Sequence, residues 1–358
     1  MPDKFGNAII DQWLVREGRA QSSFSPVERL CYIGTRGMGA LEFRPSLGFK
    51  DGAKSKPIHL NKLVELANEV LKNREDLQVN LSDENESEAL KEIIKVGTSA
   101  GGARAKAIIA WNPKTEEVRS GQCDAPSGFE HWLIKFAGVA NKDKEDNDIP
   151  EYGKIEYVYY LMAKEAGIEM MECRLLKKAG LEHFMTKRFD RINNEKLHTQ
   201  SLCAMKHFDF NYAGAYSYEQ AIQVMFELKI GHYAQIELFR RMVFNVVSRN
   251  QDDHTKNISF LMNKAGEWKL APAFDLMFNY NPNGDWTSKH QMTINGKKDD
   301  FELEDLLAVA KLFNIKKAKK IIDEVVSAVK KWELFAKSAN ISEEKIKYIK
   351  KCHRYFKI

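Results

Sequence analysis

The most informative part of the chain is a polar segment placed between apolar ones, Asn250-Gln251-Asp252-Asp253-His254-Thr255-Lys256-Asn257. Buried charges are costly unless they are paired or bind a metal, so a polar cluster in this position calls for a function. Asp252 and Asn257 have the D-x-x-x-x-N spacing of a kinase catalytic loop. The spacing predicts that Asp252 is the catalytic base, which accepts or orients the proton of an attacking hydroxyl. It also predicts that Asn257 points its carbonyl oxygen at a magnesium ion.

A further acidic residue follows the strand expected at residues 268–270, in the segment Pro272-Ala273-Phe274-Asp275-Leu276. A carboxylate at the end of the hairpin strand after the catalytic loop is where a kinase keeps its metal-binding Asp. The usual D-F-G order is absent, because Phe274 precedes the Asp and Leu276 follows it. Magnesium prefers oxygen ligands and phosphates, so one carboxylate and one amide are a suitable protein contribution. Asp275 and Asn257 are therefore the predicted metal ligands.

Lys135 is the candidate for contacting the α- and β-phosphates of ATP. It lies in the apolar segment His131-Trp132-Leu133-Ile134-Lys135-Phe136, which is predicted to be a strand. A lysine in that place favours a nearby anion, and Glu156, at the start of the next helix, is placed to pair with it as in protein kinases. The alternative is an edge-strand lysine whose ammonium group reaches solvent.

A segment rich in glycine, Gly97-Thr98-Ser99-Ala100-Gly101-Gly102-Ala103, precedes a strand expected at residues 107–111. We predict that its backbone amides cover the phosphates and that Lys106 adds positive charge. The segment does not match G-x-G-x-x-G, and it fails the P-loop pattern because Ala103 stands where a lysine is needed. An ordinary flexible turn is the alternative, and only the downstream acidic residues argue against it.

The order of the expected elements indicates two lobes. Helices are expected near residues 8–14 and at 60–72 and 156–167, with strands at 107–111, 131–136, 173–176 and 183–189. After Asp190, apolar residues recur at helical spacing over 218–228, 235–247, 303–313 and 321–335. A strand-rich half followed by a helical half is α+β and suits a bilobal, protein-kinase-like fold. We place a strand-rich N-terminal lobe at residues 1–190 and a helical C-terminal lobe at residues 191–358.

The composition is that of a globular protein with enough residues for two domains. Of 358 residues, 44% are hydrophobic and 29% are charged, and the formal net charge is +5. A net charge this small does not mark a nucleic-acid-binding protein, which normally has a concentrated basic face. The basic run Lys316-Lys317-Ala318-Lys319-Lys320 is expected to be a solvated helix face. The five cysteines are too far apart for a CxxC zinc site, and their odd number argues against a disulfide framework.

Membrane segments are not expected. No apolar stretch typical of a signal peptide follows Met1. No apolar run approaches the roughly 18 residues that are needed to span a bilayer. The expected location is therefore the cytoplasm, without a membrane partner.

Three features near the catalytic segment have simple structural explanations. His254 stands beside two acids and is expected to be an orienting or structural residue. The pair Asp252-Asp253 suggests a nuclease carboxylate cluster, but no third acid or lysine stands at nuclease spacing. The aromatic residues in this half of the chain are expected to pack in a core or loop, namely Phe208, Phe210, Tyr212, Tyr216 and Tyr218.

Taken together, these segments resemble the successive motifs of HipA-type kinases. In the order of the family they are Ser99-Ala100-Gly101-Gly102-Ala103-Arg104-Ala105-Lys106, His131 to Phe136, Lys187-Arg188-Phe189-Asp190-Arg191, Asp252 to Asn257 and Pro272 to Leu276. The segment Pro2-Asp3-Lys4-Phe5-Gly6-Asn7 is similar as well, so the resemblance covers roughly residues 1–335. The combination is specific, whereas any single segment is not.

The resemblance implies a set of nucleotide-binding residues. The segment from Lys187 through Phe189 to Asp190 matches the hinge that holds adenine through its backbone, with Asp190 near the ribose. The family often has Glu where Lys187 stands, a change that a backbone contact tolerates. The other residues assigned to binding of ATP and Mg²⁺ are Ser99, Gly101, Gly102, Lys106, Lys135, His254 and Lys256. Family members also phosphorylate a serine of their own Gly-rich loop, which ends ATP binding; Ser99 matches it, with Thr98 beside it.

The resemblance also implies a biological role, as the toxin of a bacterial toxin–antitoxin pair. Family members are neutralised by a helix-turn-helix antitoxin that binds DNA, and characterised members phosphorylate aminoacyl-tRNA synthetases. The expected function is an ATP-dependent protein serine/threonine kinase that has a protein substrate and contacts DNA only through the antitoxin. The chain opens where the family has usually completed a small N-terminal subdomain. Either the chain is a fragment, or that subdomain is a separate protein partner.

Two other functions fit the same residues. A small-molecule kinase on the same scaffold would share the catalytic residues and differ only in its acceptor. A nucleotide-binding pseudokinase in a DNA-bound repressor complex would be a regulatory protein, but pseudokinases usually lack at least one residue needed for transfer. Those residues are all present here, as Lys135, Asp252, Asn257 and Asp275.

Overall fold

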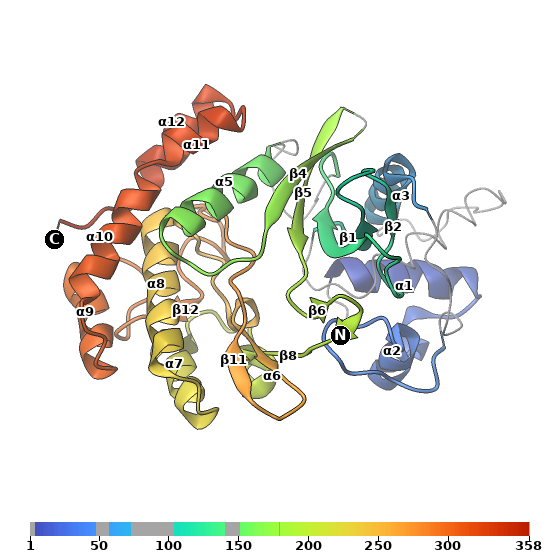
Figure 1. Ribbon diagram of the computed structural model, residues 1–358, viewed down its shortest axis with the longest axis horizontal. Coiled ribbons are helices and arrows are strands. Elements are labelled where there is room, and N and C mark those ends of the chain that lie inside the picture. Colours follow the sequence, from blue (N-terminus) through green and yellow to red (C-terminus); the bar gives the residue numbers. More distant parts are fainter. Residues whose placement is uncertain (1–3, 48–56, 73–103, 140–150, 179, 358) are drawn as a thin grey trace. The chain divides into compact units, whose positions relative to one another are not determined.

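The computed structural model describes residues 4–47, 57–72, 104–139, 151–178 and 180–357. The chain divides into two compact units (Figure 1). The first unit comprises Met1–Gly153 and Glu172–Leu197, and the second comprises Lys154–Met171 and His198–Ile358. Each unit has a hydrophobic core of its own.

The first unit is built on an antiparallel sheet. Its five strands are ordered β2-β1-β3-β5-β4 and are β1 (Lys106–Trp111), β2 (Val118–Ser120), β3 (Glu130–Lys135), β4 (Cys173–Lys178) and β5 (Leu181–Lys187). The other elements are α1 (Lys4–Arg16), the 3-10 helix η1 (Gln21–Ser23), α2 (Pro26–Ile33), α3 (Leu60–Lys72) and the hairpin of β6 (Arg191–Ile192) and β7 (Glu195–Lys196). Helices α1 and α3 pack against each other and share a core with β1 and β3 (Figure 1).

Apolar periodicity explains how these layers hold together. All six residues of β1 are buried, as expected for a strand with a neighbour on each side. Helix α1 contributes Phe5, Ile9 and Leu14, which recur at helical spacing and are fully buried. They join Trp132 of β3 in the core of the first unit.

The second unit is mainly helical. Its helices are α5 (Tyr152–Glu165), α6 (Leu202–Met205), α7 (Tyr218–Glu227), α8 (His232–Ser248), α9 (Leu303–Leu312), α10 (Ala318–Val329), α11 (Trp332–Ser338), α12 (Glu343–Cys352) and the 3-10 helix η2 (Thr255–Asn257). Its strands are β8 (His198–Ser201), β9 (Tyr216–Ser217), β10 (Ser259–Met262), β11 (Trp268–Leu270) and β12 (Met292–Thr293). They form the antiparallel sheet β11-β10-β8 and the parallel pair β12-β9.

Helix α8 positions the predicted catalytic segment. Most of its 17 residues are buried, and it packs alongside α10 (Figure 1). The helix ends at Arg249, whose φ of 59° and ψ of 38° are left-handed. A left-handed residue at this place ends a helix and redirects the chain. The segment that begins at Asn250 therefore leaves directly from the end of a buried helix.

The predicted α+β class is confirmed, because the first unit holds the five-stranded sheet and the second is helical. The helix predicted at 156–167 begins earlier, at Tyr152, and most of it belongs to the second unit. Its buried side chains, such as Tyr159 and Met162, lie in the core of that unit. The compact units therefore differ from the predicted lobes 1–190 and 191–358 at two places: residues 154–171 belong to the second unit, and residues 191–197 belong to the first.

The helix predicted at 321–335 is divided into α10 and α11, which are separated at Lys330 and Lys331.

Helix α2 starts at a capping box formed by Ser25 and Glu28, and it ends at Gly34. Gly34 then takes a φ of 58°, a conformation that glycine adopts at low cost.

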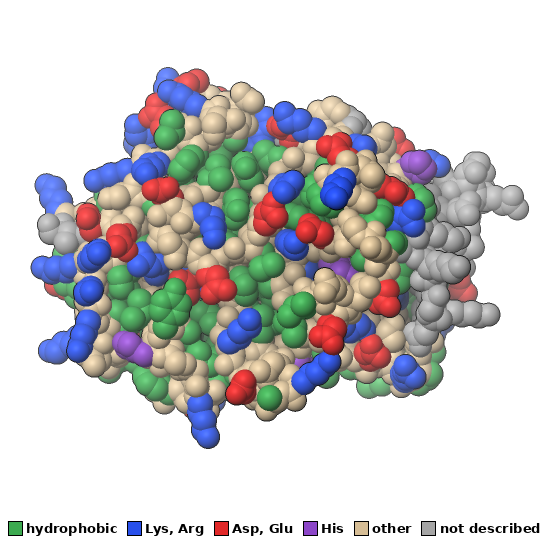
Figure 2. All heavy atoms as spheres, in the orientation of Figure 1, with side chains coloured by type: hydrophobic (Ala, Val, Ile, Leu, Met, Phe, Trp, Pro, Cys, Tyr) green, Lys and Arg blue, Asp and Glu red, His purple; other side chains and the backbone are tan. Residues whose placement is uncertain are grey.

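The surface of the second unit carries the basic run at the start of α10. Lys316, Lys317, Lys319 and Lys320 are exposed, as predicted for a solvated helix face. Figure 2 shows Lys and Arg side chains on the left of the view, where α9 and α10 lie in Figure 1. All five cysteines are free. Within the described residues, no helix has both the length and the apolar character needed to cross a membrane.

Gly121 lies against β1, and a Cβ at this position would come within 2.5 Å of the Ile109 backbone carbon. We expect Gly121→Ala to lower the free energy of unfolding by about 1–3 kcal/mol, the usual cost of overpacking. Urea denaturation measures this change. Gly37→Ala is the control in the same unit, because a Cβ there meets Ile33 at an ordinary 3.6 Å. Equal destabilisation of the two variants would contradict the close approach of Gly121 to β1.

Candidate active site

The predicted catalytic segment is a compact loop closed by its own amide group. Asn257 Nδ2 donates to the Asp252 carbonyl at 2.8 Å, and the Asn257 backbone N–H donates to the His254 carbonyl at 2.8 Å. These bonds fix the two predicted functional residues relative to each other. Because the amide nitrogen of Asn257 donates to the backbone, the amide oxygen is the end that remains to face a cation.

The Asp252 carboxylate lies among aromatic rings and stays accessible. Trp286 Nε1–H donates to Asp252 Oδ1 at 2.6 Å, and the Asp252 side chain is 27% exposed. The His254 ring packs against Phe210 and Trp286, with centroids 5.5 and 6.4 Å apart. Lys256 Nζ lies 3.9 Å from the Phe210 ring centroid. The structure thus brings the predicted residues His254 and Lys256 to the same side of the loop as these rings.

The neighbouring acid, Asp253, is buried and has different partners. Its side chain is only 1% exposed to solvent. Its Oδ2 accepts hydrogen bonds from the Tyr218 hydroxyl at 2.9 Å and from His290 Nδ1 at 2.8 Å. Its Oδ1 accepts from the Gln291 backbone N–H at 2.8 Å. Burial, and then the charge of Asp253, raises the pKa of Tyr218 well above its usual value, so this hydroxyl remains a donor. Asp253 is therefore a structural acid, held by Tyr218, His290 and Gln291.

A ladder of asparagine side chains joins this network to helix α8. Asn245 Nδ2 donates to the Tyr218 hydroxyl at 2.9 Å, and Asn250 Nδ2 donates to Asn245 Oδ1 at 2.9 Å. Asn279 Nδ2 completes the ladder by donating to Asn250 Oδ1 at 3.3 Å. All three asparagines are buried. Because a buried amide is costly unless its donors and acceptors are paired, the ladder favours one conformation of the loop.

The chain after α12 also holds the end of α8. The Arg354 N–H donates to the Val247 carbonyl at 2.9 Å. Arg249 Nε donates to the Cys352 carbonyl at 2.9 Å, across 103 residues of chain. Asp299 forms ion pairs with both Arg249 and Arg354. Arg249, which turns the chain into the predicted catalytic loop, is thereby tied to a segment far along the sequence.

Asp275 lies in the irregular segment that follows β11. Its φ of 58° is in the left-handed region, which is uncommon for a residue other than glycine. Arg241 of α8 holds the preceding segment by donating from Nη1 to the Ala271 carbonyl at 2.9 Å. The same guanidinium pairs with Glu237 at 2.8 Å, and burial lowers its pKa while Glu237 opposes that change. Helix α8 therefore anchors both the predicted catalytic loop and the segment that carries Asp275.

Asn257 and Asp275 offer an amide oxygen and a carboxylate. Hard oxygen donors suit Mg²⁺, which usually keeps waters and phosphate oxygens in place of a full protein cage. The described part of the chain contains no group of three or more His, Cys, Asp or Glu that could hold a metal ion. The donors therefore fit a magnesium ion that arrives with a nucleotide better than they fit a structural metal.

In the first unit, two predicted phosphate-binding lysines face each other across the sheet. Lys106 at the start of β1 and Lys135 at the end of β3 are directly opposite in the antiparallel register. Like charges in such a pair are destabilising, and Lys106 is only 5% exposed. Glu156, the predicted partner of Lys135, belongs to the second unit.

The predicted hinge begins at the end of β5. The backbone N–H groups of Lys187 and Arg188 donate to the carbonyls of Glu172 and His131, both at 2.9 Å. Those two N–H groups are therefore used within the sheet, and an adenine contact would use other backbone groups of the segment from Lys187 to Asp190. The Lys187 side chain pairs with Glu130 at 2.6 Å.

The Asp190 carboxylate is fully buried among donors. Arg188 binds it through two nitrogens, both at 2.8 Å, and Arg191 adds a bond at 2.9 Å. The Gly39 N–H donates to the same carboxylate at 2.7 Å. Burial by itself would raise the pKa of Asp190, but these three donors together lower it. The ribose contact stays a prediction, and the structure gives Asp190 a structural role that ties the Gly39 loop to the hinge.

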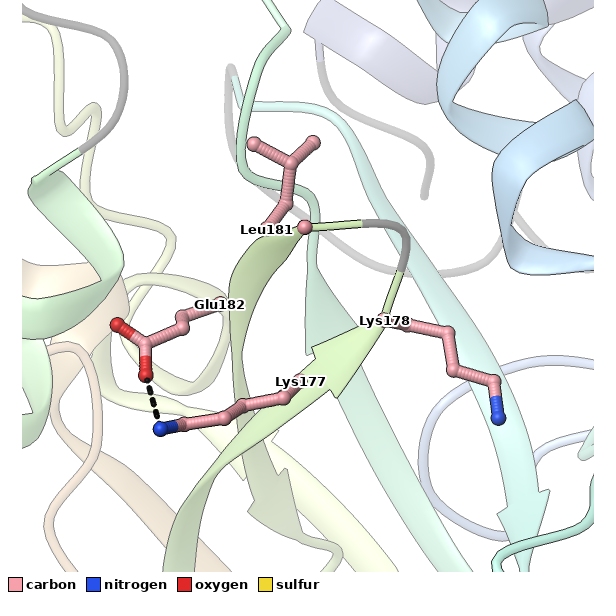
Figure 3. A pocket seen from close by; sticks show the side chains of 5 residues that line it. Lys177, Lys178, Leu181 and Glu182 are labelled. Atoms are coloured by element: carbon pink, nitrogen blue, oxygen red, sulfur yellow. Dashed lines mark ion pairs between the residues drawn. The ribbon is translucent and has the colours of Figure 1, made fainter.

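A narrow pocket of about 20 Å³ lies at the predicted catalytic loop, where Asp253, His254, Asn257 and Phe274 are among its lining residues. A pocket of about 360 Å³ lies at the β4–β5 hairpin, lined by Lys177, Lys178, Gly180, Leu181 and Glu182 (Figure 3). Lys177 and Glu182 form an ion pair of 3.2 Å there, and no predicted site residue lines the pocket. The predicted phosphate-covering residues Thr98, Ser99, Gly101 and Gly102 lie outside the described residues.

Sequence reasoning did not identify Trp286, His290 or Tyr218 as parts of the site. They lie 34, 37 and 35 residues from the acids that they contact, so no local pattern reports the contacts. Tyr218 belongs to the aromatic cluster that was expected to pack. That expectation is confirmed for Phe208 and Tyr216, whose rings stack with centroids 4.0 Å apart.

Comparisons with known proteins identify relatives of the chain. A family model described as "HipA-like C-terminal domain" matches residues 98–332. A Haemophilus influenzae protein named "Putative kinase" is 30% identical over 144 residues, which are 36% of this chain and 42% of that protein. The chain thus matches less than half of the length of this relative.

Solved structures that are similar to the chain include two bacterial proteins. One is HipA of Shewanella oneidensis MR-1, solved with HipB and operator DNA, with a TM-score of 0.61 at 17% identity over 90% of this chain and 75% of that chain. The other is the Helicobacter pylori proinflammatory kinase CtkA, with a TM-score of 0.45 at 15% identity over 70% of this chain and 86% of that chain. The likeness to the Shewanella structure confirms the predicted kinase-like fold.

The buried Asp190 predicts a pH-dependent stability. Its pKa in the folded protein lies below its usual 3.8. The carboxylate therefore contributes stability above that value, and the contribution is lost as the pH falls through the lower, folded pKa. We expect Asp190→Asn to lower the free energy of unfolding at pH 7 by about 3–5 kcal/mol, because two buried guanidinium groups lose their counter-charge.

Urea denaturation of the wild type and of Asp190→Asn at pH 7 and near pH 3 tests this expectation. The difference between the two proteins should shrink at the lower pH. Glu182→Gln is the control, because it removes an ion pair in which Lys177 is 78% exposed. That variant should change stability by less than about 1 kcal/mol. A difference for Asp190→Asn that did not depend on pH would contradict the assigned role of the carboxylate.

Proposed function

The chain belongs to the HipA-like C-terminal domain family, and we propose that it transfers the γ-phosphoryl group of ATP to a serine or threonine of a protein. One observation carries the proposal. A single loop, closed by the bond from Asn257 Nδ2 to the Asp252 carbonyl, presents an accessible carboxylate and an amide oxygen together. These are the two groups that a kinase catalytic loop needs, one for the acceptor hydroxyl and one for magnesium.

In the proposed phosphoryl transfer, each site residue has a separate role. Magnesium-bound ATP supplies the phosphoryl group, and Asn257 and Asp275 would hold the metal through hard oxygen donors. Lys106 and Lys135 would bind phosphate oxygens, as two cations at directly opposed positions of β1 and β3. Asp252 would orient the acceptor hydroxyl and take its proton as the new O–P bond forms. Phosphoryl transfer leaves little covalent work for the protein, so positioning and electrostatics supply most of the rate.

The family also supports a biological assignment. We infer that the chain is the toxin of a toxin–antitoxin pair in the cytoplasm, with a helix-turn-helix antitoxin as its partner and contact with DNA only through it. The Shewanella HipA structure supports the partner, because it was solved with HipB and operator DNA. The proposed substrate is a translation factor such as an aminoacyl-tRNA synthetase. A separate small protein that resembles the family's N-terminal subdomain is a further proposed partner.

Substitution of the proposed base and of the proposed metal ligand should separate transfer from binding. We expect Asp252→Asn to lower the rate of phosphoryl transfer by about 10²- to 10⁴-fold, the usual contribution of a general base, and to leave nucleotide binding intact. Asp275→Ala should weaken nucleotide binding in the presence of magnesium as well. Intact mass after incubation with magnesium and ATP measures transfer, and titration with a fluorescent ATP analogue measures binding.

The matched control is Asp323→Asn, which makes the same change at an exposed residue of α10 in the second unit. It should leave both transfer and binding at the wild-type level. Transfer at the wild-type rate by Asp252→Asn would refute the assignment of the base. Unchanged magnesium dependence of binding in Asp275→Ala would refute the assignment of the metal ligand.

Self-phosphorylation should occur in the glycine-rich segment. We expect the purified chain to gain one phosphate on Ser99 or Thr98 when it is incubated with magnesium and ATP, as detected by intact mass and peptide mapping. Ser99→Ala should shift the modification to Thr98 or abolish it. Modification at a serine outside residues 97–102 would contradict the proposed role of this segment.

A further inference from the structure

Residues 286–291 form hydrogen bonds with both adjacent acids of the predicted catalytic loop, Asp252 and Asp253. Trp286 binds Asp252, and the pair His290 and Gln291 binds Asp253. The contacts span 34 to 38 residues of sequence. This double attachment is built around the carboxylate that the proposed function makes the base.

The attachment at Asp253 is rigid and buried. The His290 side chain is 0% exposed, and that of Asp253 is 1% exposed. The carboxylate accepts hydrogen bonds from His290 Nδ1 and the Gln291 N–H, both at 2.8 Å, while Tyr218 of α7 binds it from another element. Buried ionic groups of this kind tolerate little movement, because loss of a partner leaves an uncompensated charge. Residues 290–291 are therefore fixed with respect to the catalytic loop.

Gln291 also restrains the backbone of Trp286. Its Nε2 donates to the Trp286 carbonyl and, at 3.3 Å, to the Lys289 carbonyl. The indole of Trp286 also lies against the rings of Phe210 and His254, at centroid distances of 6.5 and 6.4 Å. Both the backbone and the ring of Trp286 are thus held in place. The position of the indole N–H next to Asp252 is therefore set by contacts other than its hydrogen bond to Asp252.

The bond from Trp286 engages one specific carboxylate oxygen. Nε1–H donates to Asp252 Oδ1 at 2.6 Å. His254 Nε2 lies 3.8 Å from the same oxygen, and the Asp252 side chain is 27% exposed. Among the described residues, none donates a hydrogen bond to the other oxygen, Oδ2. A planar carboxylate bound at one oxygen cannot rotate freely, so the bond also sets the direction of Oδ2.

We propose that Trp286 is a positioning residue for the base: it occupies Asp252 Oδ1 and so presents Oδ2 to the acceptor hydroxyl. The inference rests on the proposed function and deepens it. In the transfer step, the hydroxyl proton moves to Oδ2 as the acceptor oxygen forms its bond to the γ-phosphorus. The bond from that phosphorus to the leaving oxygen breaks, and ADP takes the electron pair. Oδ1 keeps the indole hydrogen bond throughout.

Removal of the N–H without removal of the ring tests this role. Trp286 is replaced by β-(3-benzothienyl)alanine, in which sulfur stands in place of the indole N–H, and Trp286→Phe is made in parallel. Self-phosphorylation at saturating magnesium and ATP is followed by intact mass, and affinity for a fluorescent ATP analogue is measured separately. We expect the rate to fall by about 10- to 100-fold, as for loss of a hydrogen bond to a charged group, with nucleotide affinity unchanged.

The matched control is the same pair of replacements at Trp268. This tryptophan lies on β11 of the same unit, where it packs against the His198 ring with centroids 5.5 Å apart. Its replacements should leave the rate of transfer within about twofold of the wild type, a factor far below the loss expected for a bond to a charged group.

The indole bond can also be observed without any measurement of activity. The chain has six tryptophans, so selective ¹⁵N labelling gives a spectrum of six indole signals. The Trp286 signal is the one lost in Trp286→Phe. A bond to a carboxylate moves an indole proton downfield, and Asp252→Asn should move this signal upfield while Asp323→Asn leaves it in place.

The outcomes separate the inference from the function on which it rests. The role of Trp286 would be overturned by a wild-type rate with the benzothienyl residue. It would also be overturned if the chemical shift of the Trp286 indole signal were the same in Asp252→Asn as in the wild type. A faster rate would also overturn it, since Trp286 would then be blocking the base. If instead Asp252→Asn keeps the wild-type rate of transfer, the assignment of Asp252 as the base fails, whatever the indole signal shows. If the wild-type chain gains no phosphate with magnesium and ATP, the proposed function itself fails.

Discussion

The buried carboxylate of Asp253 is the constraint from which the rest of the site follows. It is almost inaccessible to solvent and is held by donors from two distant segments, the start of α7 and residues 290–291. Removal of such a group from water costs several kcal/mol, which is recovered only when its partners are in place. The carboxylate therefore forces Tyr218 and His290 together. It also leaves its neighbour, Asp252, directed toward solvent with a single strong donor.

Helix α8 holds the other residues of the proposed site in position. Its end turns the chain into the catalytic loop at Arg249, and its middle holds the segment before Asp275 through Arg241. Asn245 connects the same helix to Tyr218 and Asn250. A rigid, largely buried helix is a good support for such groups, because its side chains are already fixed by packing. The proposed base and both proposed metal ligands thus depend on one element.

The parts of the protein that are encoded locally could be predicted from sequence. Helix α3 and strand β11 have the expected bounds, since apolar periodicity is visible within a single element. Spacing likewise brought out Asp252 and Asn257, which lie on one loop. The break between α10 and α11 was missed, because apolar residues continue at helical spacing through it. Trp286 was missed because its partner lies 34 residues away, and nothing near an isolated tryptophan indicates a distant carboxylate.

The tie between Arg249 and the chain after α12 has a consequence for the order of biosynthesis. The ribosome makes Arg249 103 residues before it makes Cys352. At the usual elongation rate of about 5–20 residues per second, the catalytic loop lacks its contacts with residues 352–354 for about 5–20 seconds. In a nascent chain there is therefore an interval in which the end of α8 has been synthesised but has not yet formed its contacts with residues 352–354. Activity of the loop would begin late in translation, when most of the second unit has already emerged.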